Sequence, residues 1–167
     1  INPKLVLTDL VWIPATGGAA SYITALTNAG RPHFTRDSSR IWLYEGGDGL
    51  VSMRWDGTER KAHLKVTGFS PPGGGPNAQR GQAQELIASP DGSRALGWDR
   101  RGRMLVVDVT SGQVVRELSA AGLAVAPKVA VLTEHGDRVM AVTADGRALV
   151  FDVGRGDLVA DLGPGID

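Results

Sequence analysis

The chain has 167 residues, a length that fits one domain and is sufficient to bury a hydrophobic core. It carries 18 Lys and Arg against 18 Asp and Glu, and this zero net charge gives no electrostatic reason to expect binding to nucleic acid or to an anionic membrane. Cysteine is absent, which excludes disulfides, thiolate nucleophiles and iron–sulfur ligation, and no apolar run approaches the about 20 residues of a membrane-spanning helix.

Residues 1–30 are expected to form part of a repeat unit. The sequence Leu-Val-Trp-Ile-Pro-Ala-Thr-Gly at 10–17 is similar to the second half of a unit that recurs in full further along the chain. The first complete unit is predicted at about 31–68, where Thr-Arg-Asp-Ser-Ser-Arg at 35–40 matches the start of the next unit 54 residues downstream.

A stretch rich in glycine and proline follows at 68–82. It lacks the Gly-Lys-Ser/Thr ending of a phosphate-binding loop. We expect it to be an insertion that connects two units, or a lid or docking loop, since long insertions in regular folds often carry function. The best candidate for a helix, at 78–85, is short and uncapped.

The last two units, at about 83–120 and 127–163, repeat each other without a gap. Ser-Pro-Asp-Gly-Ser-Arg at 89–94 aligns with Thr-Glu-His-Gly-Asp-Arg at 133–138, and the spacing of 44 residues continues to Gly112 and Gly156. Short runs rich in β-branched residues, separated by Asp-Gly and Ser-Gly turns, predict hairpins. In the third unit they predict strands at 85–89, 94–98, 104–109 and 114–118.

A repeat of 40–45 residues with four strands is typical of a propeller blade. The predicted fold class is therefore all-β, a β-propeller segment of about 3.5 four-stranded blades in one domain over residues 1–167. Three arrangements remain open: part of a longer propeller, two copies closing one ring, or a small distorted ring. The partners expected from this architecture are other propeller blades or a second copy of the chain.

Two motifs resemble a known family. Phe-Thr-Arg-Asp at 34–37 and Ser-Pro-Asp-Gly-Ser-Arg at 89–94 are similar to the Phe-Ser-Pro-Asp-Gly element of TolB-type, WD40-like β-propeller repeats, and Ser-Met-Arg-Trp-Asp-Gly-Thr at 52–58 to the element that follows it. Residues 31–67 are most similar to propellers of periplasmic amidohydrolases and tricorn-like peptidases. Arg36 replaces the usual proline, and Glu134 with His135 replaces Pro-Asp. The resemblance implies a periplasmic or secreted protein, with a fused or associated hydrolase domain as a possible partner.

Few residues suggest chemistry. The three histidines form no His-x-His or His-Glu-x-x-His pattern, so no metal site is expected, and no Gly-x-Ser-x-Gly elbow marks a catalytic serine. His33 is a candidate binding residue because an inner blade strand would line a central channel. Arg36 and Arg101 are further binding candidates, the latter within the basic cluster at 100–103. For each of them a structural or solvated role is the competing interpretation.

Recurring acidic and glycine residues are assigned to turns. Asp37 and Asp91 occupy equivalent positions, and Asp91-Gly92 and Asp145-Gly146 are hairpin signals. Since one active site would not be repeated in every blade, these residues are expected to stabilise turns. Asp108 and Asp152 also recur, and they are expected to anchor hydrogen bonds at the end of the third strand.

These observations favour a protein- or ligand-binding β-propeller module that belongs to a larger protein. The alternative is the non-catalytic propeller portion of a secreted amidohydrolase or peptidase, which would position substrate for a catalytic domain absent from this chain. In both cases we expect no cofactor, no metal, no nucleic acid and no membrane span.

Overall fold

A computed structural model of the chain describes residues 7–46, 48–65, 86–98, 103–119 and 127–164. These residues form strands joined by turns, and none of the described residues lies in a helix that could cross a membrane. The strands are β1 (Leu7–Trp12), β2 (Ser21–Thr27), β3 (Arg40–Glu45), β4 (Gly49–Arg54), β5 (Lys61–Leu64), β6 (Leu86–Ala88), β7 (Arg94–Trp98), β8 (Met104–Asp108), β9 (Val114–Leu118), β10 (Val129–Leu132), β11 (Arg138–Val142), β12 (Arg147–Asp152) and β13 (Asp157–Pro164).

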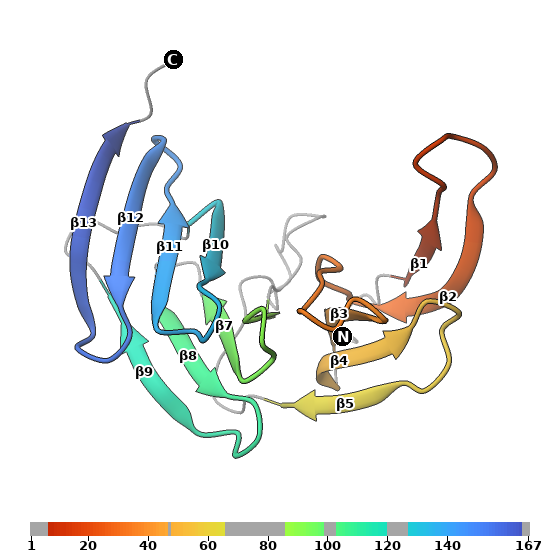
Figure 1. The fold of residues 1–167 in the computed structure, drawn as a ribbon, viewed down its shortest axis with the longest axis horizontal. Coiled ribbons are helices and arrows are strands. Elements are labelled where there is room, and N and C mark those ends of the chain that lie inside the picture. Colours follow the sequence, from red (N-terminus) through yellow and green to blue (C-terminus); the bar gives the residue numbers. More distant parts are fainter. Residues whose placement is uncertain (1–6, 47, 66–85, 99–102, 120–126, 165–167) are drawn as a thin grey trace, which may run out of the picture.

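The strands form four antiparallel sheets in the order β1-β2, β3-β4-β5, β6-β7-β8-β9 and β10-β11-β12-β13. In every sheet, strands that follow one another in the sequence are neighbours, as expected for hairpin connections. His33 extends the second sheet, because it forms an isolated antiparallel bridge with Trp42 of β3. The sheets follow one another along an open arc, with β10 on its concave side and β13 on its convex side (Figure 1).

Alternation along the strands explains why the sheets stack. In β8, Met104 and Val106 belong to the hydrophobic cluster shared with the last sheet, whereas Leu105 and Val107 belong to the cluster shared with the second sheet. Successive side chains of a strand point to opposite faces, so an apolar strand supplies two interfaces at once. We call the face of a sheet that looks toward the next sheet in chain order its forward face, and the other its backward face.

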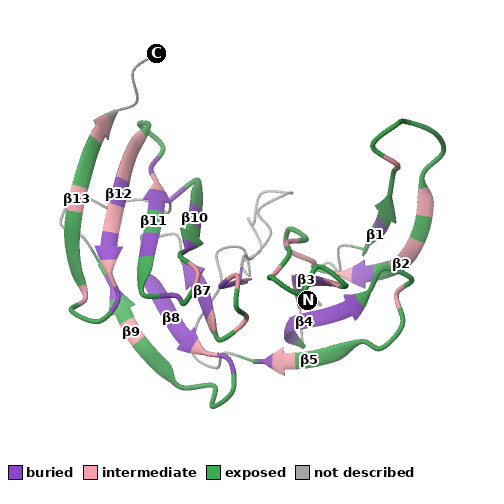
Figure 2. Ribbon diagram, in the orientation of Figure 1, coloured by how far each residue is buried: buried purple, intermediate pink, exposed green. Residues whose placement is uncertain are grey.

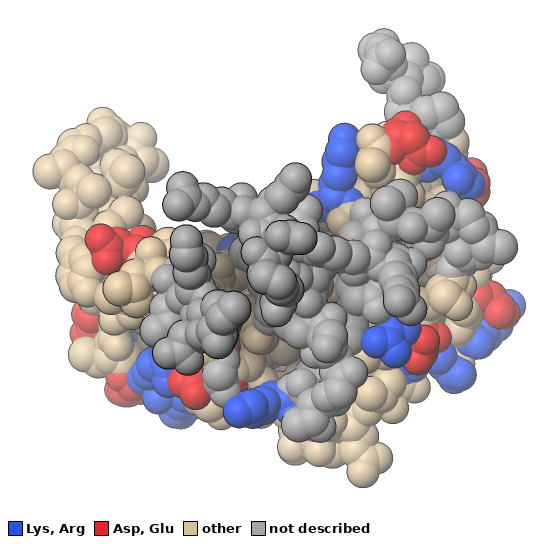
Figure 3. Space-filling model, turned by 180° about the vertical axis from the view of Figure 1, so that it is seen from behind, with Lys and Arg blue, Asp and Glu red and all other residues tan. Residues whose placement is uncertain are grey.

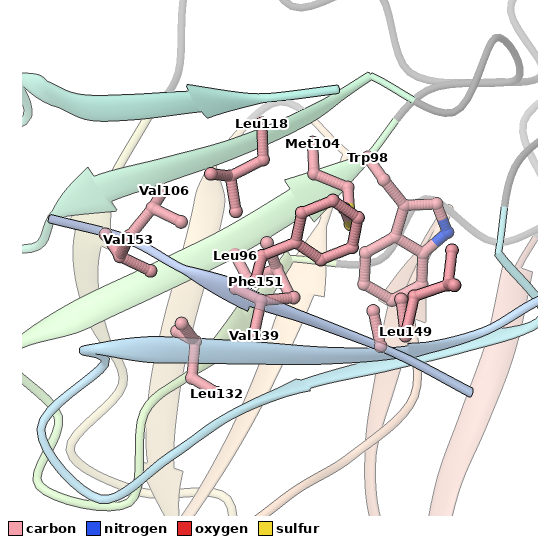
Figure 4. Packing of buried hydrophobic residues seen from close by; sticks show 12 residues of the cluster. Leu96, Trp98, Met104, Val106, Leu118, Leu132, Val139, Leu149, Phe151 and Val153 are labelled. Atoms are coloured by element: carbon pink, nitrogen blue, oxygen red, sulfur yellow. The ribbon is translucent and has the colours of Figure 1, made fainter. Parts of the chain in front are cut away.

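The best-filled interface lies between the third and fourth sheets (Figure 4). Phe151 of β12 packs there against side chains of β7 and β8 and is fully buried. A second cluster joins the second and third sheets, and a third joins the first two sheets through Leu10, Leu26 and residues of β3 and β4. Each sheet therefore depends on its neighbours for burial, as in repeat proteins.

The two ends of the arc are more exposed than its centre. Figure 2 shows mostly buried residues on β4, β7 and β8 of the two middle sheets and many exposed residues on β1, β2 and β13. Exposed large apolar side chains occur at both ends, among them Leu7 and Tyr22 in the first sheet and Met140 and Leu162 in the last. The first and last sheets therefore each leave apolar surface in contact with solvent.

The all-β prediction is confirmed, and the predicted strands of the third unit agree with β6 to β9 to within one residue where both are described. The glycine- and proline-rich insertion at 68–82, the helical candidate at 78–85 and Arg101 lie outside the described residues.

Candidate interaction surface on the concave side

The first structural feature of this surface is a turn that recurs after the innermost segment of three sheets. In the third sheet the turn joins β6 to β7, and the fully buried Ser89 hydroxyl donates to Asp91 Oδ1 at 2.7 Å. The same oxygen accepts from the backbone N–H and the hydroxyl of Ser93 at 3.0 and 2.8 Å. Burial opposes ionisation, but these bonds and the contact with His135 hold the pKa of Asp91 well below its usual range.

In the other two turns a carboxylate also accepts hydrogen bonds from within the turn, but from different residues. Asp37 accepts from the N–H and hydroxyl of Ser39 at 3.1 and 2.6 Å, and these bonds lower the pKa of Asp37. In the fourth sheet the aligned position is His135, and the carboxylate has moved two residues along the turn. There Asp137 accepts from the hydroxyl of Thr133, a bond that lowers the pKa of Asp137. The aspartate is at a different position of the turn, but in both sheets it accepts a hydrogen bond that stabilises the turn.

We define the turn row as residues 35–39, 89–93 and 133–137, because backbone bonds join these three turns side by side. Arg36 N–H donates to the carbonyl of Pro90 at 2.5 Å, and Asp91 N–H donates to the carbonyl of Glu134 at 3.2 Å. The row lies on the concave side of the arc, since each turn follows the innermost segment of its sheet (Figure 1).

Charged side chains also connect the turns. The Arg36 guanidinium lies 2.6 Å from Glu134 Oε1 and so bridges the first and third turns, with side chains that are 72% and 39% exposed. His135 Nδ1 lies 3.0 Å from Asp91 Oδ2. An exposed ion pair such as that of Arg36 with Glu134 contributes about 0–1 kcal/mol, so it adds little to stability.

A shallow, open groove of about 530 Å³ lies between the first two turns. Trp42 and Pro90 are the apolar residues of its lining, which we call the floor, and Arg36, Asp37 and Asp91 are the charged residues, which we call the rim. Its lining residues are Thr35, Arg36, Asp37, Trp42, Pro90, Asp91 and Gly92.

His33 occupies a structural position close to this groove. Its Nε2 accepts the backbone N–H of Ala88 in β6 at 2.9 Å, and its Nδ1 lies 3.4 Å from the carbonyl of Arg31. Acceptance at Nε2 requires the proton to be on Nδ1, so the ring is neutral and links the second sheet to the third. Burial lowers the pKa of His33, although the bond to Arg31 acts in the opposite direction.

A serine–histidine contact that the sequence did not indicate lies between β4 and β5. Ser52 Oγ is 2.7 Å from His63 Nε2, and Arg40 Nε donates to the same hydroxyl at 2.9 Å. Ser52 is fully buried, and burial together with the charges of Arg40 and Lys61 lowers the pKa of His63. A nucleophilic serine needs access to substrate and an acidic residue that orients the histidine, so this cation-flanked contact is structural.

The remaining turn residues lie away from the groove. Asp145 accepts from the hydroxyl of Thr143, which lowers the pKa of Asp145, and Gly146 completes that turn with a positive φ of 84°. Asp108 accepts from the N–H of Ser111 at 2.7 Å, and Asp152 accepts from the N–H of Arg155 at 2.9 Å. Both are therefore anchors of the turn before the outermost strand.

The structure thus brings together at one groove four of the residues singled out in the sequence, namely Arg36, Asp37, Asp91 and Gly92. No group of three or more His, Asp or Glu residues among the described residues could hold a metal ion. The residues that sequence reasoning missed are Glu134 and His135 as cross-turn partners. Glu134 is at the turn position aligned with Arg36, and His135 is at the position aligned with Asp91, so this pairing of residue types was a usable signal.

Charged side chains are unevenly distributed over the molecule. Figure 3 shows positive and negative side chains interspersed over the described parts of one face and a wide uncharged region at one end. That end is the first sheet, in which Asp9 is the charged residue between Leu7 and Thr27. Interspersed charges fit specific contacts with a protein better than attraction to a polyanion.

Comparisons with known proteins identify the fold and leave the family open. No protein-family model matches the chain, and no curated protein matches it. Among solved structures, the chain is similar to that titled "Structure of U3-55K", a WD40 β-propeller protein, with a TM-score of 0.52 and 16% identity. The match covers 81% of this chain and 39% of that chain, so the chain spans well under half of its structural neighbour. The likeness, together with the four antiparallel sheets, shows that the fold is that of a β-propeller segment.

Proposed function

We propose that this chain is a protein-interaction scaffold that binds an extended segment of a partner protein across the turn row. The observation that carries the proposal is the groove between two adjacent turns, which has a floor of Trp42 and Pro90 and a charged rim. Propeller loops on a rigid scaffold are well suited to such binding, because the turns are fixed by buttressed carboxylates and by their neighbours.

The charges of the rim indicate the kind of segment. Asp37 and Asp91 remain ionised because hydrogen bonds lower the pKa of each. Arg36 is the cation of the groove lining, and Glu134 neutralises it. A partner segment with an apolar side chain for the floor and one Lys or Arg for the carboxylates would complement this surface.

The test compares two charge reversals. Arg36→Glu changes the rim of the groove, and Arg54→Glu is its matched control, because Arg54 is also an exposed arginine in a surface ion pair, with Glu59. Peptides selected from a random display library on the wild-type chain are measured by fluorescence anisotropy against both variants. We expect Arg36→Glu to change affinity at least 10-fold and Arg54→Glu to change it less than 2-fold, in proportion to about 1.4 kcal/mol per tenfold step.

The proposal fails if the selected peptides bind both variants as tightly as the wild type, or if no peptide is selected that needs the folded chain. Association with an amidohydrolase or peptidase domain, and a periplasmic or secreted location, are carried by the sequence resemblance of residues 31–67 alone. They stay predictions, and detection of a hydrolase domain in the same polypeptide would be their test.

A further inference from the structure

The forward face of the last sheet repeats an interface that the third sheet already uses. Residues of the third sheet that pack against the fourth are Leu96, Trp98, Met104, Val106 and Leu118, with the partly buried Ile87 beside them. Residues 44 positions later in the sequence are Met140, Val142, Ala148, Val150, Leu162 and Val131. Every one of these residues is apolar.

The register of the last sheet places most of this second set in two rows. Val131, Met140, Val150 and Ala160 are paired across all four strands, and Val129, Val142 and Ala148 are paired across three. The interior-facing residues of the same strands, such as Val139 and Phe151, are fully buried, whereas Val131 and Met140 are 44% and 46% exposed. One face of the sheet is therefore packed and the other is an apolar surface without a sheet against it among the described residues.

A polar contact follows the same repeat. Arg94 Nη1 of the third sheet donates to the carbonyl of Gly136, in the turn of the fourth sheet, at 2.8 Å. The aligned residue in the fourth sheet is Arg138, which is exposed at the start of β11. A sheet packed on the forward face would place its own turn carbonyl where Arg138 can donate to it.

We propose that a further four-stranded propeller blade of the same repeat, carried by a longer form of this polypeptide, docks on the forward face of β10–β13. This face is the surface of Val131, Met140, Val142, Val150 and Leu162, with Arg138 at its edge. Continuity with the existing interfaces supports this occupant, because all three clusters between described sheets form within one chain. A second copy offers a poorer fit, since its backward face belongs to the first sheet, whose described strands β1 and β2 are too few to cover four strands. The proposal is independent of binding at the turn row.

The test lengthens the chain with its own repeat. A second copy of residues 121–164 is placed directly after Pro164, which keeps the spacing of 44 residues, and we call this protein the extended chain. Because cysteine is absent, one introduced thiol reports on one site. Val106→Cys and Val150→Cys are nearly isosteric substitutions at aligned positions, the first on the covered face of the third sheet and the second on the uncovered face of the fourth.

Thiol reactivity with an aromatic disulfide reagent gives the readout, and light scattering gives the mass of each protein. In the 167-residue chain we expect Val150→Cys to react about 100-fold faster than Val106→Cys, since the buried thiol reacts through local opening. In the extended chain we expect both thiols to react slowly in a monomer. Arg138→Ala in the extended chain should speed the reaction at Val150→Cys by about 10-fold, as expected for the loss of a hydrogen bond from a charged group, whereas Arg155→Ala should leave it unchanged.

Several results would overturn the proposal. One such result is a Val150→Cys thiol that reacts fast in the extended chain while the Val106→Cys thiol reacts slowly. The slow thiol shows that the first four sheets are folded, so the fast one means that the added blade does not dock. A slow thiol at Val150→Cys in the monomeric 167-residue chain means that the face is already covered. Protection that arises only as the 167-residue chain dimerises identifies a second copy as the occupant.

Discussion

At the scale of single residues, Gly136 shows how one turn is fitted to the neighbouring sheet. Its φ is +65°, and a Cβ added there would lie 2.7 Å from Arg94 Cδ and 2.9 Å from Arg94 Cβ. Gly146 has a similar φ of +84°, but a Cβ there would meet no atom within 4 Å. Both Gly→Ala changes carry the backbone cost of about 1–2 kcal/mol for a left-handed conformation, and Gly136→Ala adds a steric cost of about 1–3 kcal/mol. Urea unfolding should therefore show a larger loss for Gly136→Ala, and equal losses would contradict the contact with Arg94.

Two histidines make the stability of the fold depend on pH. The pKa of His33 is lowered by burial, and the pKa of His63 by burial and by the charges of Arg40 and Lys61. In the unfolded chain both imidazoles take up a proton near pH 6.5, whereas in the folded chain their pKa values are lower. Their contribution to the free energy of unfolding is therefore complete above about pH 6.5 and is lost as the pH falls through that value toward the folded pKa. Urea midpoints should fall from pH 7.5 to 5.5, and His33→Gln, which keeps an acceptor for Ala88 N–H, should reduce that fall. A wild-type midpoint that is constant or rises on acidification would refute this assignment.

At the scale of the element, the forward faces of the third and fourth sheets are predicted to respond differently to the same kind of substitution. Leu96 and Met140 occupy aligned positions in β7 and β11, but Leu96 is fully buried and Met140 is 46% exposed. Leu96→Ala should lower the free energy of unfolding by about 2–5 kcal/mol. Met140→Ala should change it by about 0.5 kcal/mol or less, as for a surface site. Guanidinium unfolding measures both, and a Met140→Ala loss as large as that of Leu96→Ala would show that the face is covered.

Much of the element structure could be predicted from the sequence, because a period of 44 residues aligns the strands and Asp-Gly and Ser-Gly turns separate them. Side-chain roles could be predicted less well. The alignment of the two repeats pairs Asp91 with His135, whereas the carboxylate that stabilises the turn of the fourth sheet is that of Asp137. The contact of Ser52 with His63 arises across two strands in which a register shift lies between Leu50 and Val51, and such a bulge leaves no clear signal in the sequence.

At the scale of the whole molecule, the chain is an open arc of propeller blades with the turn row on its concave side. Stacking buries one face of each terminal sheet and leaves the other exposed, so the ends are the natural sites for further blades. If the first and last sheets closed on each other instead, facing residues would lie about 10 Å apart, which is the spacing of packed sheets.

The distance between the two terminal sheets therefore tests the open arc most directly. Spin labels are attached to Tyr22→Cys in β2 and Met140→Cys in β11, both exposed positions in a chain without other cysteines, and pulsed electron paramagnetic resonance measures their separation in the monomer. The open arc predicts a distance distribution wholly above about 20 Å, twice the spacing of packed sheets. A distribution centred at or below that value would mean that the terminal sheets meet and that the arc is a closed ring.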